Sequence, residues 1–285
     1  MRQWTIDKPE QLTFGAVRRL NVRIVAGRLA VLASEGPPGL EVTEVGDPPL
    51  LVTHEEDGTL TVTYKDLTWE GLLGWLRPGR RRATLTLTVP KDCPVSAGVV
   101  SASAVVAGFE TRTSVRSVSG GIVLDGVSGE VQADTVSGAV ESRGLVGDLS
   151  FKSVSGELTV ARGTPRRLKA TTVSGRITAD LELPPTGHVT LNSVSGEIVV
   201  RLPHEVAADV AIRSTSGRIG TGFSELDHAS QPGLKTVSGR IGGGMASLTA
   251  TTVSADVTLL KGEPGMDQRT GEEPRGTAPA DGEAS

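Results

Sequence analysis

The chain has 285 residues and a net charge of −4, with 37% hydrophobic but only 3% aromatic residues. This charge argues against nonspecific binding to nucleic acid, and the single cysteine, Cys93, excludes an intrachain disulfide. A core this poor in aromatics has to be built from Val, Ile, Leu and Ala, and the 36 glycines indicate many tight turns.

Residues 1–95 are predicted to form an N-terminal β-rich region. Residues 20–24 alternate apolar and polar side chains up to Val25-Ala26-Gly27, and the alternation resumes over residues 28–31. Asp57-Gly58 is a favoured hairpin turn, and residues 83–89 form a regular alternating strand that ends at Pro90. We expect this region to be a divergent start of the sheet system that follows it.

The amino-terminal residues 1–8 contain no apolar signal core. No apolar run in the chain approaches the roughly 20 residues that span a bilayer. The sequence therefore predicts a cytoplasmic protein.

One segment interrupts the strand pattern between residues 69 and 82. It combines two tryptophans with four arginines: Trp69, Trp75, Arg77, Arg80, Arg81 and Arg82. Aromatic anchors beside basic residues suit a protein partner or, as the less favoured alternative, a membrane surface. The other interpretation, which we prefer, is that the segment folds back and caps the open end of the sheet system.

Residues 96–261 carry an internal repeat whose unit is Val-Ser-Gly. The repeat glycines are Gly120, Gly129, Gly138, Gly156, Gly175, Gly196 and Gly239, with a degenerate copy at Gly217 and a half-match at Gly147. Five of these are nine residues apart, and later steps lengthen to 19, 21, 21 and 22 residues. A half-turn of nine residues and a full turn near eighteen predict an all-β solenoid of stacked strand-corner-strand units.

Each corner is flanked by alternating apolar residues, with a Ser or Thr just before the valine. We expect the Ser or Thr hydroxyl to face inward and bond to backbone groups of the corner. We also expect the valines to form one buried column, so that Val173→Asp would unfold the chain. The expected members of that column are Val118, Val136, Val154, Val173, Val194 and Val237.

The residues that follow the repeat glycines are expected to face solvent. Glu157, Arg176, Glu197 and Arg218 have mostly alternating charge and would form one exposed ladder with no catalytic duty. No metal-ligand spacing, nucleophile elbow or phosphate loop is present, so no catalytic, cofactor-binding or metal-binding residue is predicted. Residues 262–285 are rich in Gly, Pro and acidic side chains and are predicted to be a disordered tail.

The Ser/Thr-Val-Ser-Gly corners, together with Val89-Pro90 ahead of them, resemble a bacterial β-strand-repeat domain of unknown function that is often labelled "putative adhesin". The resemblance runs from about Leu20 to Leu260. It implies a β-solenoid and, because relatives occur beside envelope-stress systems of the Lia and phage-shock type, a scaffold or sensing role near the membrane. The adhesin label implies a surface role.

Three functions follow as hypotheses. The leading one is a non-catalytic scaffold or protein-interaction module, linked to envelope-stress signalling or a neighbouring regulator, with an unknown protein partner and no cofactor. The alternative is an exported adhesin or carbohydrate-binding surface protein. A polysaccharide lyase or hydrolase would need a cluster of Asp, Lys or Arg across three adjacent turns, and the sequence pattern does not reveal one.

Overall fold

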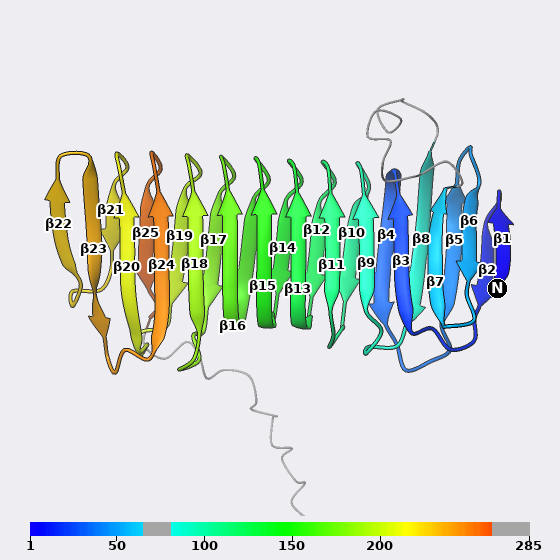
Figure 1. Cartoon of the computed structure of the whole chain (residues 1–285), viewed down its shortest axis with the longest axis horizontal. Coiled ribbons are helices and arrows are strands. Elements are labelled where there is room, and N and C mark those ends of the chain that lie inside the picture. The colour runs from blue at the N-terminus through cyan, green and yellow to red at the C-terminus, as the bar shows by residue number, and fades with distance from the viewer. Residues whose placement is uncertain (65–80, 264–285) are drawn as a thin grey trace, which may run out of the picture.

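The computed structural model describes residues 1–64 and 81–263, which form 25 β-strands and no helix. The chain winds as a long solenoid whose strands fall into two sheets, A and B, facing each other across a narrow core (Figure 1). Within these residues no helix has the length and apolar character needed to cross a membrane. The predicted all-β solenoid is confirmed.

Sheet A forms the front row in Figure 1 and sheet B the row behind it. Sheet A has the order β1 (Arg2–Ile6), β6 (Leu50–His54), β7 (Thr59–Tyr64), β3 (Arg19–Ile24), β9 (Val95–Val99), β11 (Thr113–Ser117), β13 (Ser128–Thr135), β15 (Val146–Ser153), the second half of β16 (Leu158–Thr172), β18 (His188–Ser193), β24 (Ala246–Thr252), β20 (Ala208–Ser214), β23 (Leu234–Ile241) and β22 (Asp227–Gln231).

Sheet B has the order β2 (Glu10–Thr13), β5 (Gly39–Val45), β8 (Arg82–Val89), β4 (Ala26–Ala33), β10 (Ser103–Ala107), β12 (Ile122–Asp125), β14 (Val140–Arg143), the first half of β16, β17 (Ile177–Leu181), β19 (Ile198–Leu202), β25 (Val257–Lys261) and β21 (Ile219–Thr221). A strand of sheet A and the sheet B strand that follows it make one coil of the solenoid.

The central coils advance by eighteen residues, as the repeat predicted. Thr113 of β11 pairs with Val131 of β13, and Ile122 of β12 pairs with Val140 of β14. The pairing is parallel in both sheets, because each coil starts in the same direction as the one before it.

The N-terminal region is part of the same solenoid. Strand β3 pairs in parallel with β9, and β4 pairs in parallel with β10. Beyond this coil, β1 and β6 in sheet A and β2 and β5 in sheet B pair antiparallel and close the end. Trp4 packs edge-on against Phe14 at this end, with 5.5 Å between ring centroids.

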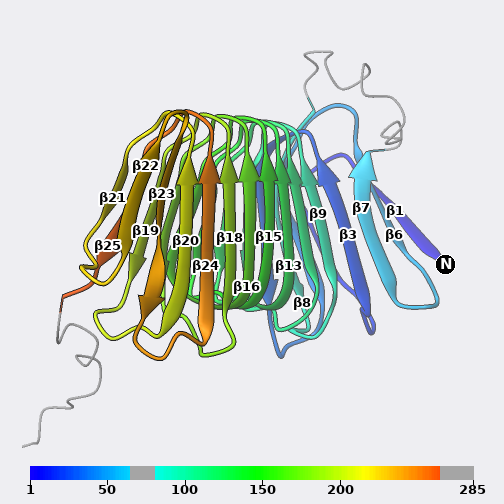
Figure 2. The same cartoon turned by 60° about the vertical axis from the view of Figure 1, so that its left-hand side comes forward.

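Coils at both ends are stacked out of chain order. The coil of β3 and β4 lies between the coil of β7 and β8 and that of β9 and β10. Similarly, the last coil, β24 and β25, lies between the coil of β18 and β19 and that of β20 and β21 (Figures 1 and 2). Neighbours in the sequence are therefore not always neighbours in the stack.

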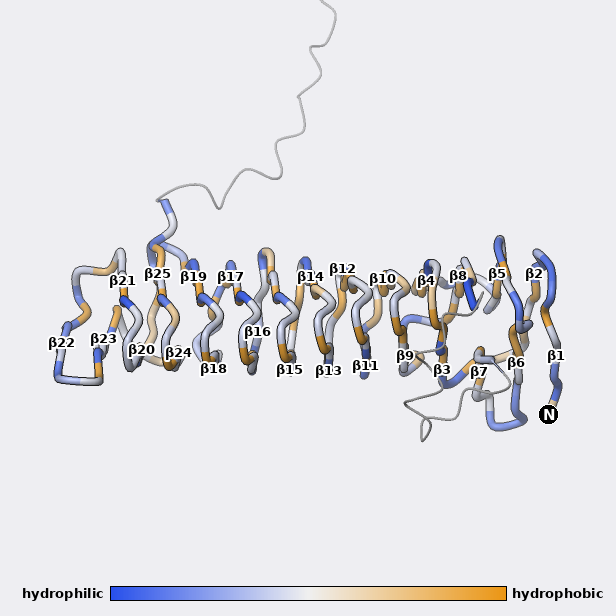
Figure 3. The backbone as a smooth tube through the Cα atoms, turned by 90° about the horizontal axis from the view of Figure 1, so that it is seen from above, coloured by the Kyte–Doolittle hydropathy of each residue, from blue (hydrophilic) through white to orange (hydrophobic). Residues whose placement is uncertain are grey.

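The core consists of columns of small aliphatic side chains, one residue from each coil. Leu149, Leu168, Val189 and Leu248 lie in register in sheet A, and each is at most 2% exposed. Strands of both sheets alternate buried residues with half-buried or exposed ones along the chain, as in β17 and β20. Seen from above in Figure 3, the coils form one row of flattened loops. Because the two sheets are so close, one layer from each fills the space between them.

Candidate functional site

The Val-Ser-Gly corners connect sheet A to sheet B and are held by the Ser or Thr that precedes them. The hydroxyl of Ser153 accepts a hydrogen bond from Gly156 N at 2.7 Å, and that of Ser193 accepts one from Gly196 N at 2.7 Å. Thr135 and Thr172 bond in the same way to Gly138 and Gly175. The predicted inward Ser and Thr residues thus close their own corners through a local side-chain to backbone bond.

The valines of the corners point outward, so the predicted buried column is wrong. Val136, Val154, Val173 and Val194 are 46–52% exposed, whereas the repeat glycines beside them are buried. Because the inward positions are taken by the Ser or Thr and by the glycine, the two residues between them, valine and serine, must both face solvent. Val118 is partly buried, and Val237 is buried because it belongs to β23.

The outward position of the valines reverses the expected effect of a charge. We now expect Val173→Asp to change the free energy of unfolding by less than about 1 kcal/mol, because the side chain is half-exposed and the carboxylate can remain hydrated. Ala170→Asp, which places the same group at a buried position in β16, should cost more than about 3 kcal/mol. Urea denaturation of the two variants tests this. If Val173→Asp unfolds the chain, the corner valines are buried, as the sequence predicted, and the outward position is wrong.

A serine follows each corner valine and ties adjacent coils together. Ser155 donates both its N–H, at 2.8 Å, and its Oγ, at 3.3 Å, to the carbonyl of Val136 in the coil before it. Ser137, Ser174, Ser195 and Ser254 repeat this pair of bonds. The exposed serine hydroxyls therefore have backbone partners and form a ladder along the corner edge.

The valines of five consecutive coils make a continuous apolar line, which we call the valine ridge. Its members are Val136, Val154, Val173, Val194 and Val253, each 46–52% exposed. Towards the N-terminal end the same column continues through the less exposed Val118, Val100 and Val25. Scattered exposed valines are ordinary, but a line of them along one edge is an organised apolar surface.

The structure places the candidate corner glycines on two different edges. Gly120, Gly138, Gly156, Gly175, Gly196 and Gly217 lie at the edge that carries the valine ridge, and Gly129 lies at the opposite edge, where sheet B returns to sheet A. Gly239 is not a repeat corner. It lies inside β23, which runs antiparallel to β20.

The predicted ladder of charged residues that follow the repeat glycines is found only in part. Arg176 pairs with Glu197 at 3.1 Å, but Arg218 pairs with Asp256 at 2.7 Å and not with Glu197. The reason is the displaced last coil, which places Asp256 between Glu197 and Arg218 in the stack. These side chains are 37–86% exposed, so each pair contributes little to stability.

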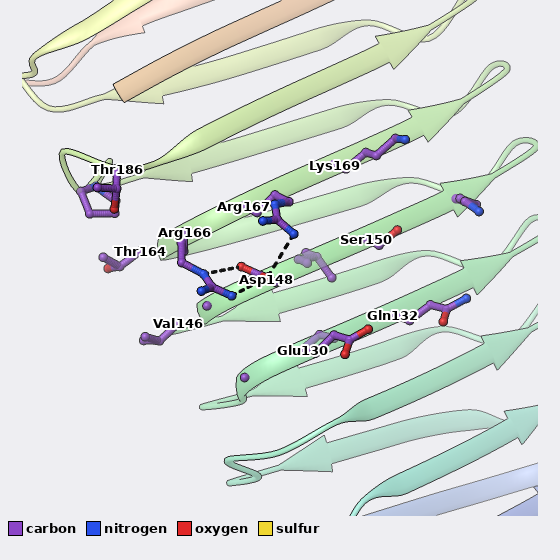
Figure 4. A pocket seen from close by; sticks show the side chains of 16 residues that line it. Glu130, Gln132, Val146, Asp148, Ser150, Thr164, Arg166, Arg167, Lys169 and Thr186 are labelled. Carbon is purple, nitrogen blue, oxygen red and sulfur yellow. Dashed lines mark hydrogen bonds and ion pairs between the residues drawn. The ribbon is translucent and has the colours of Figure 1, made fainter. Parts of the chain in front are cut away.

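A groove of about 1070 Å³ crosses the outer face of sheet A over β13, β15 and β16. The connection between β17 and β18, with Pro184 and Thr186, borders it on one side (Figure 4). Its centre is Asp148, whose side chain is only 17% exposed. Arg166 donates to both carboxylate oxygens, at 3.0 and 2.8 Å, and Arg167 approaches to 3.6 Å.

A β-bulge brings these two arginines together. The pairing of β15 with β16 shifts by one residue between Gly147 and Asp148, so that Arg166 is an extra residue and faces outward beside Arg167. The hydrogen bonds from Arg166 hold the pKa of Asp148 below its usual value despite partial burial, and the charges of both arginines add to this. The carboxylate is therefore ionised at neutral pH.

The groove was not predicted from the sequence, which did not reveal a charged cluster across adjacent turns. The structure brings Glu130, Asp148, Lys152 and Lys169 together with the two arginines on three adjacent strands. A signal was present: the step from Gly156 to Gly175 is 19 residues instead of 18, which is the one residue that the bulge adds.

The cluster is poorly suited to proton transfer. Asp148 has a lowered pKa and both of its oxygens accept bonds from Arg166, and arginines remain protonated at any ordinary pH. Burial raises the pKa of Cys93 to about 11, so this thiol is not an activated nucleophile. The described residues also contain no group of three or more His, Cys, Asp or Glu side chains that could hold a metal ion.

Most of the predicted tryptophan–arginine segment falls outside the described residues, including Trp69, Trp75, Arg77 and Arg80. Arg81 and Arg82 are described, and Arg82 begins β8. Tyr64 ends β7 in sheet A, so the chain leaves and re-enters the described fold between the two sheets at the edge of the valine ridge. The Arg81 carbonyl accepts a bond from Ala26 N at 3.1 Å, next to Val25 of the valine column.

Comparisons with known proteins place the chain in a family. Solved structures with similar chains include a "putative adhesin" from Bacteroides fragilis (8% identity, TM-score 0.48, covering 90% of this chain and 97% of that one). Others are a "putative adhesin" (11%, 0.38, 91% and 97%) and a "putative lipid binding protein" (13%, 0.38, 90% and 98%), both from Parabacteroides distasonis. These names describe those proteins alone. No curated protein gave a significant match. The family model described as Toastrack DUF4097 matches residues 39–260, and the chain belongs to that family.

Proposed function

We propose that this chain is a non-catalytic interaction module and that the valine ridge is the surface that docks a protein partner. The observation that carries the proposal is the row of five valines on consecutive coils, each 46–52% exposed. Contiguous apolar surface on a monomer commonly marks an interaction site. The ridge repeats one residue type at the same corner position of consecutive coils.

The chemistry beside the ridge lowers the cost of covering it. The serine hydroxyls next to the valines already donate to backbone carbonyls, at 3.2 to 3.4 Å. A partner that removes water from this edge would therefore leave no hydroxyl proton without an acceptor. Both residues sit on corners that are tied to the next coil by backbone bonds, so little conformational freedom remains to be lost on binding.

The tryptophan–arginine segment belongs to the same proposal. Its described flanks, Tyr64 and Arg81, lie at the edge along which the ridge runs. We propose that Trp69 and Trp75 contact the same protein partner and do not cap the fold, because β1, β2, β5 and β6 already close the N-terminal end. Aromatic and basic residues are typical anchors of protein interfaces.

The family resemblance supports a more specific form of the proposal, in which the partner is a regulator of an envelope-stress system and binds on the cytoplasmic side. Fractionation of the native host, before and after membrane stress, tests the location. Recovery of the chain only from the cell surface would contradict it and favour an exported adhesin.

The test of the docking surface uses two matched triple variants. Val154, Val173 and Val194 are changed to serine on the ridge, and Val105, Val123 and Val199, outward-facing on sheet B, are changed to serine in the control. We expect the ridge variant to fold, and we expect the amount of protein that co-purifies with it from the host to fall at least tenfold. The control should keep them. Equal recovery with both variants would contradict the proposal.

A further inference from the structure

We infer that the groove centred on Asp148 is a second, independent binding site and that its ligand is a linear polyanion. Asp148 lies near the beginning of β15 and Arg166 near the beginning of the sheet A half of β16, whereas the valine ridge follows the ends of these strands. The inference rests on the groove's charges and shape and does not depend on a partner at the ridge.

The groove is positive although the chain is negative. Its lining holds four cations, Lys152, Arg166, Arg167 and Lys169, against the two carboxylates of Glu130 and Asp148, which leaves an excess of two positive charges. The chain as a whole carries −4. A local field of opposite sign would attract an anion to this face and not to the rest of the surface.

The arginines are pre-positioned and still accessible. Asp148 fixes Arg166 through two hydrogen bonds and holds Arg167 at 3.6 Å, as the dashed lines in Figure 4 show. The guanidinium side chains nevertheless remain 67% and 66% exposed. One carboxylate cannot neutralise two guanidinium groups, and their remaining N–H donors match the oxygens of phosphate or carboxylate groups.

The arrangement favours a chain of charges over a single anion. Lys152 and Lys169 lie further along their strands than Asp148 and Arg167, so the cations follow the groove and do not converge on one point. The groove is open, and its volume of about 1070 Å³ is too large for one small anion. Repeated anionic groups on a polymer would meet successive cations.

The lining also disfavours two other ligands. It contains no aromatic side chain, so neither the faces of neutral sugars nor nucleic acid bases find a stacking partner there. The expected ligand therefore binds through its charges, and its affinity should fall steeply with salt. Polyphosphate and polyuronate chains share this chemistry and represent its phosphate and carboxylate sources.

The test measures binding of inorganic polyphosphate and of polygalacturonate by calorimetry at 50 and 300 mM salt. The groove variant replaces Lys152, Arg167 and Lys169 by glutamine and keeps the Asp148–Arg166 pair intact. The control variant replaces Arg19, Arg28 and Arg213, which are exposed outside the groove, by glutamine and thus removes the same charge. We expect at least a tenfold weaker affinity in the groove variant and less than a twofold change in the control.

Several results would overturn the inference. The first is that neither polymer binds at 50 mM salt, and the second is that both variants lose affinity equally. The third is that inorganic phosphate displaces polyphosphate when the two are present at equal concentrations of phosphate groups, which would indicate a site for a small anion. Tighter binding of single-stranded DNA than of either polymer would also contradict it. The polymer that binds more tightly identifies the phosphate or the carboxylate source. Because the ridge valines are unchanged in both variants, failure here leaves the docking proposal untouched.

Discussion

Replacing Gly175 by alanine will destabilise the solenoid by about 3 kcal/mol or more. A Cβ at this position would overlap the carbonyl oxygen of Gly156 and lie 2.7 Å from its carbonyl carbon and 3.0 Å from the Thr172 hydroxyl. The obstacle is backbone of the neighbouring coil, which cannot turn aside as a flexible side chain can. The two coils would have to separate, and the hydrogen bonds of the corner would be lost.

The matched control is Gly220→Ala. Gly220 lies in β21 with nothing within 4 Å of an added Cβ, so its replacement should change the free energy of unfolding by less than about 0.5 kcal/mol. Urea denaturation followed by circular dichroism measures both. A Gly175→Ala variant as stable as the control would mean that the coils are further apart at this corner than the structure shows.

Phe151→Ala should be about as damaging, with an expected loss of about 3–5 kcal/mol. The ring is fully buried, and its neighbours in the adjacent coils of sheet A are Ala133 and Ala170. Neither alanine has a side chain long enough to fill the cavity that the missing ring would leave. The surrounding backbone is held by parallel pairing on both sides and can collapse only a little.

Val154→Ala, only three residues away in the chain, serves as the control and should cost less than about 1 kcal/mol because the side chain is half-exposed. Solenoids can lose part of the stack before the rest. Amide hydrogen exchange of residues 128–181 is therefore measured together with denaturation, so that a local loss of these coils is detected. If Val154→Ala lowers the free energy of unfolding as much as Phe151→Ala does, the Val154 side chain is not on the surface.

The solenoid itself could be predicted because a repeat imposes one local geometry many times. The direction of the corner valines could not be read from hydropathy alone. In Ser153-Val154-Ser155-Gly156, hydropathy predicts that the valine faces inward. The inward positions are instead taken by Ser153, whose hydroxyl accepts a hydrogen bond from Gly156 N, and by Gly156, which lies against the neighbouring coil. Hydrogen bonding and close backbone approach outweigh the burial of one valine at this position.

The order in which the coils stack could not be predicted from the sequence pattern either. Coils share one local pattern, so nothing in residues 246–261 signals that they enter between two earlier coils. The pairing of Arg218 with Asp256 depends on that placement. The groove at Asp148 was missed for a similar reason, because only the extra residue in the 19-residue step hinted that Arg166 and Arg167 would share one carboxylate.

The valine ridge as a docking surface is tested most directly by site-specific photocrosslinking in the native host. A photoreactive amino acid is placed at Val154 on the ridge and, in a second strain, at Thr178 on the outer face of sheet B. The proposal predicts a discrete adduct of the chain with one protein from position 154 and none from position 178. The absence of any adduct at 154, or the same adducts from both positions, would contradict it.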